Sequence, residues 1–149
     1  MIRHLQMPLL AALLGLVCFG FGCGGSGSKT PPLVPATGKV TLDGAPMTIG
    51  MVTFQPDEAK GNTLKYSPTG PIDSSGNYKL MTDGKDGAPV GWYKVTISAY
   101  GMPTGQVDSK GAAPKSNLNS KYQSPATSGI TLEVVASPAP GAYDLKVTK

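Results

Sequence analysis

The sequence predicts an all-β fold, a sandwich of two sheets built from seven short strands, in a single domain over residues 37–149. Three observations predict it. The chain of 149 residues contains 20 Gly and 14 Pro, roughly twice the usual share, which is typical of a turn-rich β domain. Apolar residues recur with a period of two in several short segments. No segment carries an apolar helical stripe over about 11 residues.

The first 22 residues have the pattern of a cleaved signal peptide. Arg3 and His4 give a short positive start, and residues 7–22 consist of apolar residues, glycine and one proline. A membrane-spanning helix needs about 20 apolar residues, so this shorter segment fits the core of a signal peptide better than a span. We therefore expect residues 1–22 to be removed on export.

Cys23 resembles the modified cysteine of bacterial lipoproteins. Gly22 precedes it and a Gly/Ser segment, residues 24–28, follows it, as in the lipobox of that family. The resemblance implies cleavage before Cys23 and attachment of a diacylglycerol to its thiol. The new amino group is then usually acylated, and two or more acyl chains hold a protein stably at a membrane. Gly20 departs from the pattern, which favours Leu at that position, and the alternative is an ordinary secretory signal with an incidental cysteine.

The same resemblance implies a place in the bacterial envelope. Gly24 is not the Asp that favours inner-membrane retention in many lipoproteins, so we expect the outer membrane. Residues 23–36 form the tether, flexible in its Gly/Ser part and extended around Pro31 and Pro32. After cleavage Cys23 is the only cysteine, and no intramolecular disulfide can form.

Seven segments of the domain alternate between apolar and polar residues, or are short apolar runs, between turn residues. In Tyr93, Val95 and Ile97 the alternation is clearest, and these side chains are expected to face inward. Gly, Pro, Asp and Asn separate the segments, as in a two-sheet sandwich. The predicted strands are 39–42, 51–54, a segment around 65–72, 78–80, 93–99, 130–134 and 143–147.

Four motifs, in order, resemble the carboxypeptidase regulatory-like domain. They are residues 37–46 (TGKVTLDGAP), 52–54 (VTF), 73–78 (DSSGNY) and 91–95 (GWYKV), and the resemblance covers nearly all of residues 37–149. It implies a transthyretin-like (prealbumin-like), immunoglobulin-like β-sandwich. It also implies a non-catalytic module displayed at the cell envelope.

Turn chemistry alone explains most of these motif residues. Gly38, Gly44 and Gly76 are candidates for positive φ at tight turns, and Asp73 and Asn77 can bond turn amides through their side chains. Gly91 then allows a closely packed start to the following strand.

A calcium loop is a weak alternative for one of these turns. Asp73, Ser75 and Asn77 alternate oxygen-bearing side chains, as in the first half of an EF-hand loop. Counting from Asp73, however, Tyr78 and Gly84 stand where that loop has Gly and a bidentate Glu. We therefore predict a polar hairpin turn and no cofactor.

Trp92 is the most informative side chain of the domain. If Tyr93 and its alternating neighbours point inward, Trp92 points outward with Lys94 and Thr96, and Tyr100 joins this row if the strand stays regular. An exposed aromatic row can bind a sugar or a partner's apolar surface. The alternative is that the loop over residues 101–120 folds over Trp92 and hides it.

The residue inventory argues against catalysis. The only histidine, His4, and the only arginine, Arg3, lie in the leader, which removes zinc, non-haem iron and Ser-His-Asp chemistry from the mature chain. The remaining pairs, Ser109 with Lys110 and Ser120 with Lys121, lie in loops where a lysine base lacks burial.

The leading hypothesis is a lipid-anchored module for protein interaction or structural packing at the envelope. The runner-up is a carbohydrate-binding module on the same surface, and a Ser/Lys hydrolase is a distant third. The mature chain has 12 lysines against nine acidic residues and no basic cluster, so nucleic acid is not an expected partner. The expected partners are the membrane, through the anchor, and an envelope protein or polysaccharide.

Overall fold

The structure, a computed structural model, describes residues 31–99 and 118–149, which form β-strands and two short 3-10 helices. In these ranges no helix is long and apolar enough to cross a membrane. The predicted all-β fold is confirmed, whereas the predicted leader and Cys23 lie outside the described residues. The elements are β1 (Leu33–Val34), β2 (Thr37–Leu42), β3 (Ala45–Pro46), β4 (Gly50–Pro56), η1 (Glu58–Lys60), β5 (Thr69–Ile72), β6 (Asn77–Lys79), β7 (Met81–Thr82), β8 (Lys85–Asp86), β9 (Ala88–Pro89), β10 (Gly91–Ser98), η2 (Ser120–Gln123), β11 (Thr131–Val134) and β12 (Leu145–Val147).

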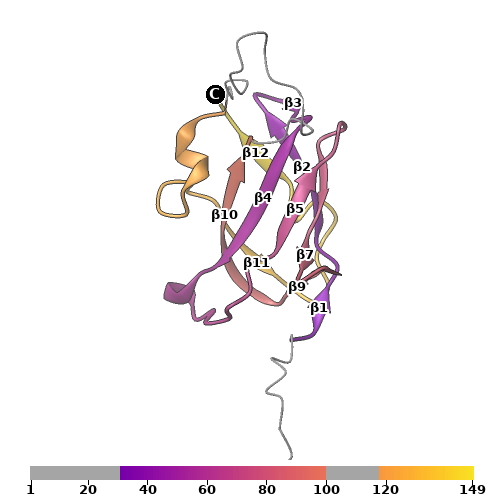
Figure 1. Cartoon of the computed structure of the whole chain (residues 1–149), viewed down its shortest axis with the longest axis vertical. Coiled ribbons are helices and arrows are strands. Elements are labelled where there is room, and N and C mark those ends of the chain that lie inside the picture. Colours follow the sequence, from indigo (N-terminus) through magenta and orange to yellow (C-terminus); the bar gives the residue numbers. More distant parts are fainter. Residues whose placement is uncertain (1–30, 100–117) are drawn as a thin grey trace, which may run out of the picture.

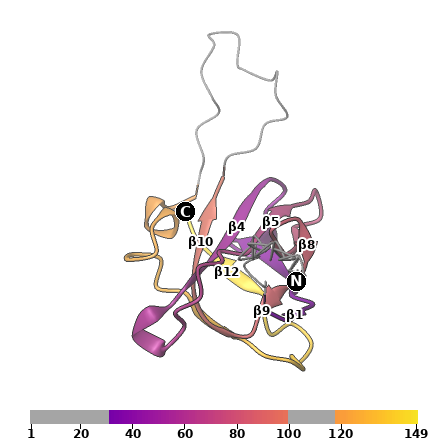
Figure 2. The ribbon, with the colours of Figure 1, turned by 60° about the horizontal axis from the view of Figure 1, so that its bottom comes forward.

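One large curled sheet makes up most of the described molecule (Figure 1, Figure 2). Its main path runs in the order β11-β10-β4-β5-β6-β2-β12. Neighbours on this path are antiparallel except β12 and β2, which are parallel. β3 pairs with β2, β7 pairs with β5 and β8, and β1 pairs with β9 in a separate two-stranded sheet.

The seven predicted strands overlap the seven strands of the main path, but hydrogen bonding joins them into one sheet and not two. β5 pairs with both β4 and β6, and β6 pairs in turn with β2, so the ladder passes from one half of the curl to the other. Where the sequence predicted two sheets of a sandwich, the structure shows one curled sheet and the small β1–β9 sheet. Alternation determines which side chains of a strand share a face, but it carries no information about which strand lies alongside.

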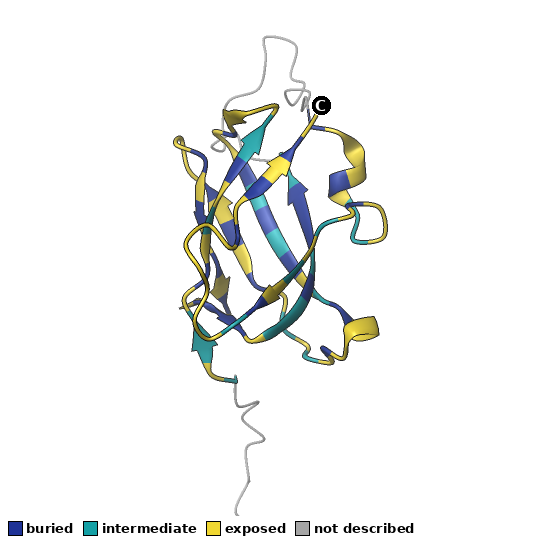
Figure 3. Ribbon diagram, turned by 180° about the vertical axis from the view of Figure 1, so that it is seen from behind, coloured by how far each residue is buried: buried dark blue, intermediate teal, exposed yellow. Residues whose placement is uncertain are grey.

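The interior is lined by alternate residues of the strands, as the sequence predicts (Figure 3). On β10, Tyr93, Val95 and Ile97 are fully buried, whereas Trp92 before them and Lys94 between them are half-buried. Thr96, predicted to point outward with these two, is also buried. Ile130, Leu132, Leu42 and Ala99 are only partly buried. The other buried residues at alternating apolar positions of the predicted strands are Val40, Tyr78, Leu80, Val134, Tyr143, Leu145 and Val147.

Phe54 of β4 lies at the centre of an aromatic cluster. Its ring centroid is 6.4 Å from that of Tyr78, 5.8 Å from that of Tyr93 and 6.5 Å from that of Tyr143, in tilted or edge-on geometry. Each of these tyrosines brings a hydroxyl into the interior, and buried hydroxyls need partners. Tyr78 Oη donates to the Tyr143 carbonyl at 2.6 Å, and Tyr93 Oη donates to the Pro89 carbonyl at 2.8 Å. The cluster therefore fills the core and fixes the backbone of two connecting segments.

Position 38 of β2 needs glycine because a side chain would not fit there, and not because its backbone conformation demands glycine. The prediction of positive φ holds for Gly44 and Gly76 but not for Gly38. A Cβ at Gly38 would lie 2.3 Å from the Tyr143 carbonyl oxygen and 2.9 Å from Tyr78 Oη. Glycine at this position thus allows the segment before β12 to approach the sheet closely enough for the Tyr78 hydrogen bond.

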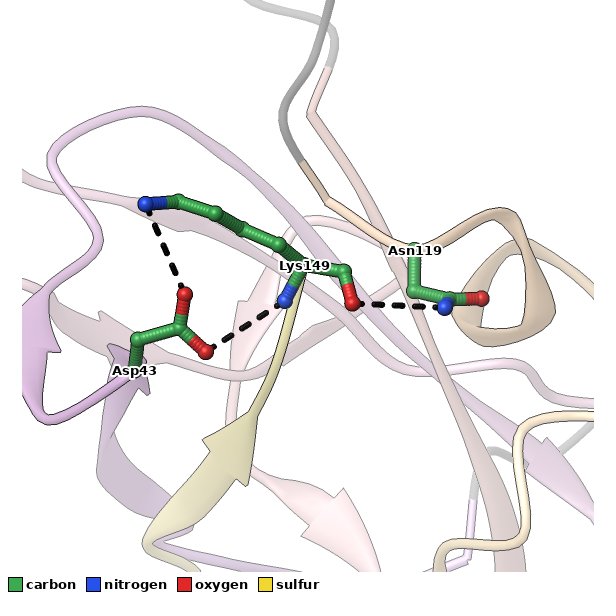
Figure 4. A network of polar contacts seen from close by, with 3 residues as sticks. All are labelled: Asp43, Asn119 and Lys149. Atoms are coloured by element: carbon green, nitrogen blue, oxygen red, sulfur yellow. Dashed lines mark hydrogen bonds and ion pairs between the residues drawn. The ribbon is translucent and has the colours of Figure 1, made fainter.

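The end of β12 is held by a small polar network (Figure 4). The Lys149 backbone N–H donates to Asp43 Oδ1 at 3.4 Å, and Lys149 Nζ lies 3.6 Å from Asp43 Oδ2. Asn119 Nδ2 donates to the Lys149 carbonyl at 3.3 Å, and the Asn119 N–H donates to the Thr148 carbonyl at 3.2 Å. These contacts bring together the turn after β2, the end of β12 and the start of η2.

We expect Tyr78→Phe to lower the free energy of unfolding by about 1 to 2 kcal/mol, because it removes a buried hydrogen bond and leaves the Tyr143 carbonyl without that donor. Urea denaturation of the folded domain measures the change. Tyr122→Phe is the matched control, since the Tyr122 hydroxyl lies 3.4 Å from Thr148 Oγ1 in a part-buried, long contact. Equal losses in the two variants would contradict this role of Tyr78.

Candidate functional site

Trp92 lies on the outer face of β10, as the alternation predicts. Its neighbour in sequence, Tyr93, points into the core, and Trp92 is half-buried. Across the sheet it is paired with Glu133 of β11 on one side, and on the other its carbonyl accepts the Asp57 N–H at 2.9 Å. Trp92 therefore lies on the outward surface of a strand that has a neighbour on both sides, next to the terminal strand β11.

The described cover over Trp92 comes from the segment that follows β4. Lys60, at the end of η1, places Nζ 3.7 Å from the centroid of the Trp92 ring. A cation at this distance over an indole face is attracted by the negative face of the ring. The predicted cover by residues 101–120 lies largely outside the described residues, as does Tyr100, the third member of the predicted aromatic row.

A buried asparagine fixes this cover to the sheet. Asn62 Nδ2 donates to the Trp92 carbonyl at 2.8 Å, and Asn62 Oδ1 accepts the Leu64 N–H at 3.2 Å. A Cβ at Gly91 would lie 2.9 Å from Asn62 Nδ2, so the predicted close-packing role of Gly91 is confirmed and its neighbour is Asn62. The Asn62 N–H also donates to the Asp57 carbonyl at 3.1 Å. With both ends of its side-chain amide engaged, Asn62 holds the loop rigidly beside Trp92.

Lys94, predicted as a binding residue, has an internal partner. Its Nζ lies 3.6 Å from Asp57 Oδ1, and the Asp57 side chain is only 4% exposed. Among the described residues Asp57 Oδ1 has no hydrogen-bond partner, so the nearby ammonium is its main compensation. Lys94 therefore balances a buried carboxylate next to Trp92.

A hollow of about 380 Å³ lies beside the Trp92 ring and is bordered mostly by apolar groups. Val90, 48% exposed, and Leu64, half-buried, contribute aliphatic surface. Such a rigid, largely apolar concavity with few polar groups is typical of a contact site. The lining residues are Pro31, Pro32, Lys60, Gly61, Asn62, Thr63, Leu64, Pro89, Val90, Gly91 and Trp92.

The weak calcium candidate forms a hydrogen-bonded turn. Asp73 Oδ1 accepts the N–H groups of Ser75 and Asn77, both at 2.8 Å, and Asp73 Oδ2 accepts Asn77 Nδ2 at 3.3 Å. The bond from the Asn77 backbone is the main reason that the pKa of the Asp73 carboxyl is lowered. Within residues 31–99 and 118–149 no group of three His, Cys, Asp or Glu side chains is placed to hold a metal ion.

A second, larger hollow of about 650 Å³ lies over β2 and β6, next to Asp73. Three of its four charged side chains, those of Asp73, Lys79 and Asp144, already have partners in the protein. Asp144 Oδ1 accepts the Lys39 N–H at 2.9 Å, and Lys79 Nζ lies 2.7 Å from Asp86 Oδ2. This larger hollow therefore offers few free charged groups to a ligand.

Of the two Ser/Lys pairs considered for a hydrolase, the one within the described residues is exposed. Ser120 and Lys121 are both exposed on η2, and Lys121 Nζ lies 4.8 Å from the Tyr122 ring centroid. A lysine that acts as a base needs a desolvated setting. Ser109 and Lys110 lie outside the described residues.

Removing the Lys60 side chain should expose Trp92. We expect Lys60→Ala to increase quenching of tryptophan emission by acrylamide, while the free energy of unfolding changes by less than about 1 kcal/mol. Because Trp92 is the only tryptophan of the chain, the emission reports on this site alone. Lys65→Ala, on the same exposed loop, is the control, and equal quenching in the two variants would show that Lys60 does not cover the ring.

Comparison with known proteins finds no relative of this chain. No protein-family model, no curated protein and no solved structure matches the chain. The resemblance to the carboxypeptidase regulatory-like domain therefore remains a prediction from the sequence, and the fold statement depends on the structure alone.

Proposed function

We propose that this chain is a non-catalytic, lipid-anchored module of the bacterial cell envelope, and that it acts through apolar contact at the Trp92 hollow. Its role is protein interaction or structural packing at the envelope, with the outer membrane as the preferred location. The anchor part of the proposal is supported by the residues around Cys23 and by the apolar leader that precedes them.

One observation carries the contact site: the only tryptophan of the chain is half-exposed beside a rigid, mostly apolar hollow. Contact energy is concentrated at aromatic anchors in such hollows, since a fixed ring loses little conformational freedom on binding. The backbone of Trp92 is fixed by its strand and by Asn62, which bonds its carbonyl, and Lys60 lies over its ring. The exposed Val90 at the same rim extends the apolar surface.

Carbohydrate binding, the alternative, is less well supported by the same geometry. A sugar needs an open aromatic face and several free hydrogen-bonding groups, but Lys60 already lies over the Trp92 ring. The Asn62 amide is engaged on both sides, which leaves Lys60 and the Thr63 hydroxyl as the main polar groups of the rim. An apolar contact requires neither an open ring face nor a set of free polar groups.

We also propose that the curled sheet is a variant of the transthyretin-like sandwich. One feature supports this: β2 and β12, the strands near the two ends of the domain's sequence, pair with each other in parallel.

Site-specific photo-crosslinking in the living bacterium tests the contact. With a photoreactive residue at Val90, we expect several times more adduct with an envelope component than with the same residue at Ile49, which is similarly exposed at 39%. Trp92→Ala should reduce the Val90 adduct to the Ile49 level. Equal adducts at both positions would contradict the proposal, and Trp92-dependent binding on a glycan array would favour the carbohydrate alternative.

A further inference from the structure

The chain enters the domain beside the Trp92 hollow. Pro31 and Pro32 border the hollow, and the next residues form β1, which pairs with β9 through Leu33 with Pro89 and Val34 with Ala88. Figure 1 shows β1 and β9 at one end of the molecule, with β3 and the C-terminus at the other. The tether and the hollow therefore share one end of the domain.

β1 is clamped at this end. Gly87, with φ of 108°, lies against it, and a Cβ there would be 2.6 Å from the Val34 carbonyl oxygen. Leu33 and Val34 are both half-buried. The point at which the tether leaves the domain is thus fixed relative to Trp92.

The segment between Cys23 and Pro31 is short compared with the domain. It contains seven residues, and the eight Cα–Cα steps from Cys23 to Pro31 span about 28 Å when fully extended. A domain of about 100 residues has a radius of gyration of about 13 Å, so its diameter is of the same order as the longest possible tether. An acylated Cys23 therefore keeps the hollow within about 30 Å of the membrane surface.

The side chains at this end suit the boundary between lipid and water. Tryptophan and lysine are concentrated there in membrane proteins, because each combines an apolar body with a polar tip. Trp92 and Lys60 are stacked on each other, and the exposed Val90 and the half-buried Leu64 are next to them. The loop after β4 carries Lys60, Lys65 and a single acidic exposed residue, Glu58.

We propose that the partner of the Trp92 hollow is the headgroup region of the membrane that holds Cys23. This inference rests on the lipid anchor of the proposed function and takes its structural-packing form: the surface against which the hollow packs is the membrane itself. The domain then lies with its β1–β9 end on the bilayer and presents the β3 end to the solvent. A protein partner at the hollow is the competing outcome of the test.

The test uses the lipidated full-length product, purified from membranes and reconstituted into vesicles of phosphatidylethanolamine and phosphatidylglycerol. The vesicles carry a nitroxide either on the headgroup or at the end of an acyl chain. We expect the headgroup nitroxide to quench Trp92 emission more strongly than the acyl-chain nitroxide. Val90→Asp should at least halve this quenching, whereas the matched control Ile49→Asp should leave it unchanged.

Flotation of the same vesicles separates the possible failures. The membrane contact is overturned if the protein floats but its Trp92 emission is not quenched, or if the Val90→Asp and Ile49→Asp variants are quenched equally. In either case the anchor is intact and the hollow is open to a protein partner. Protein that does not float overturns the anchor, and the membrane contact fails with it.

Discussion

The fold depends on one close approach, between Gly38 of β2 and the backbone of Tyr143 just before β12. Any side chain at position 38 would occupy the space of the Tyr143 carbonyl, which lies 2.3 Å from the position of a Cβ. That carbonyl instead accepts the Tyr78 hydroxyl, and the following strand pairs in parallel with β2. The contact joins the last strand to the second strand of the domain and closes the curl around Phe54. The parallel pair, the Tyr78 hydrogen bond and the packing of Tyr143 against Phe54 depend on it.

The candidate site lies on the outer face of this framework and also depends on a few close contacts. Gly91 leaves room for Asn62, Asn62 bonds the Trp92 carbonyl, and Lys60 then lies over the ring. Asp57, buried beneath the same loop, is balanced by Lys94. The Asn62 amide is engaged on both sides and Lys94 faces Asp57, so the surface that remains for a partner is mainly the apolar part of the hollow. For this reason we propose an apolar contact at the hollow and not a sugar-binding site.

The sequence predicted the framework better than the site, for physical reasons. Alternation in Tyr93, Val95 and Ile97 is a local signal, because burial on one face requires every second residue to be apolar. The joining of all seven strands in one sheet, the role of Gly38 and the burial of Asp57 depend on contacts between distant residues. Asn62 carried a visible turn signal after Gly61, but its bond to a carbonyl 30 residues away left no trace in the local pattern. The two-residue strands β1 and β9 are too short to show any period.

We propose that a lipid on Cys23 holds the domain at a membrane, at the end where Trp92 lies. The test is the intact mass, with fragmentation of the N-terminus, of the protein purified from bacterial membranes after expression of the full chain. We expect a mature chain that begins at Cys23 and carries a diacylglycerol on its thiol. A chain that begins elsewhere, or that begins at an unmodified Cys23, would contradict it.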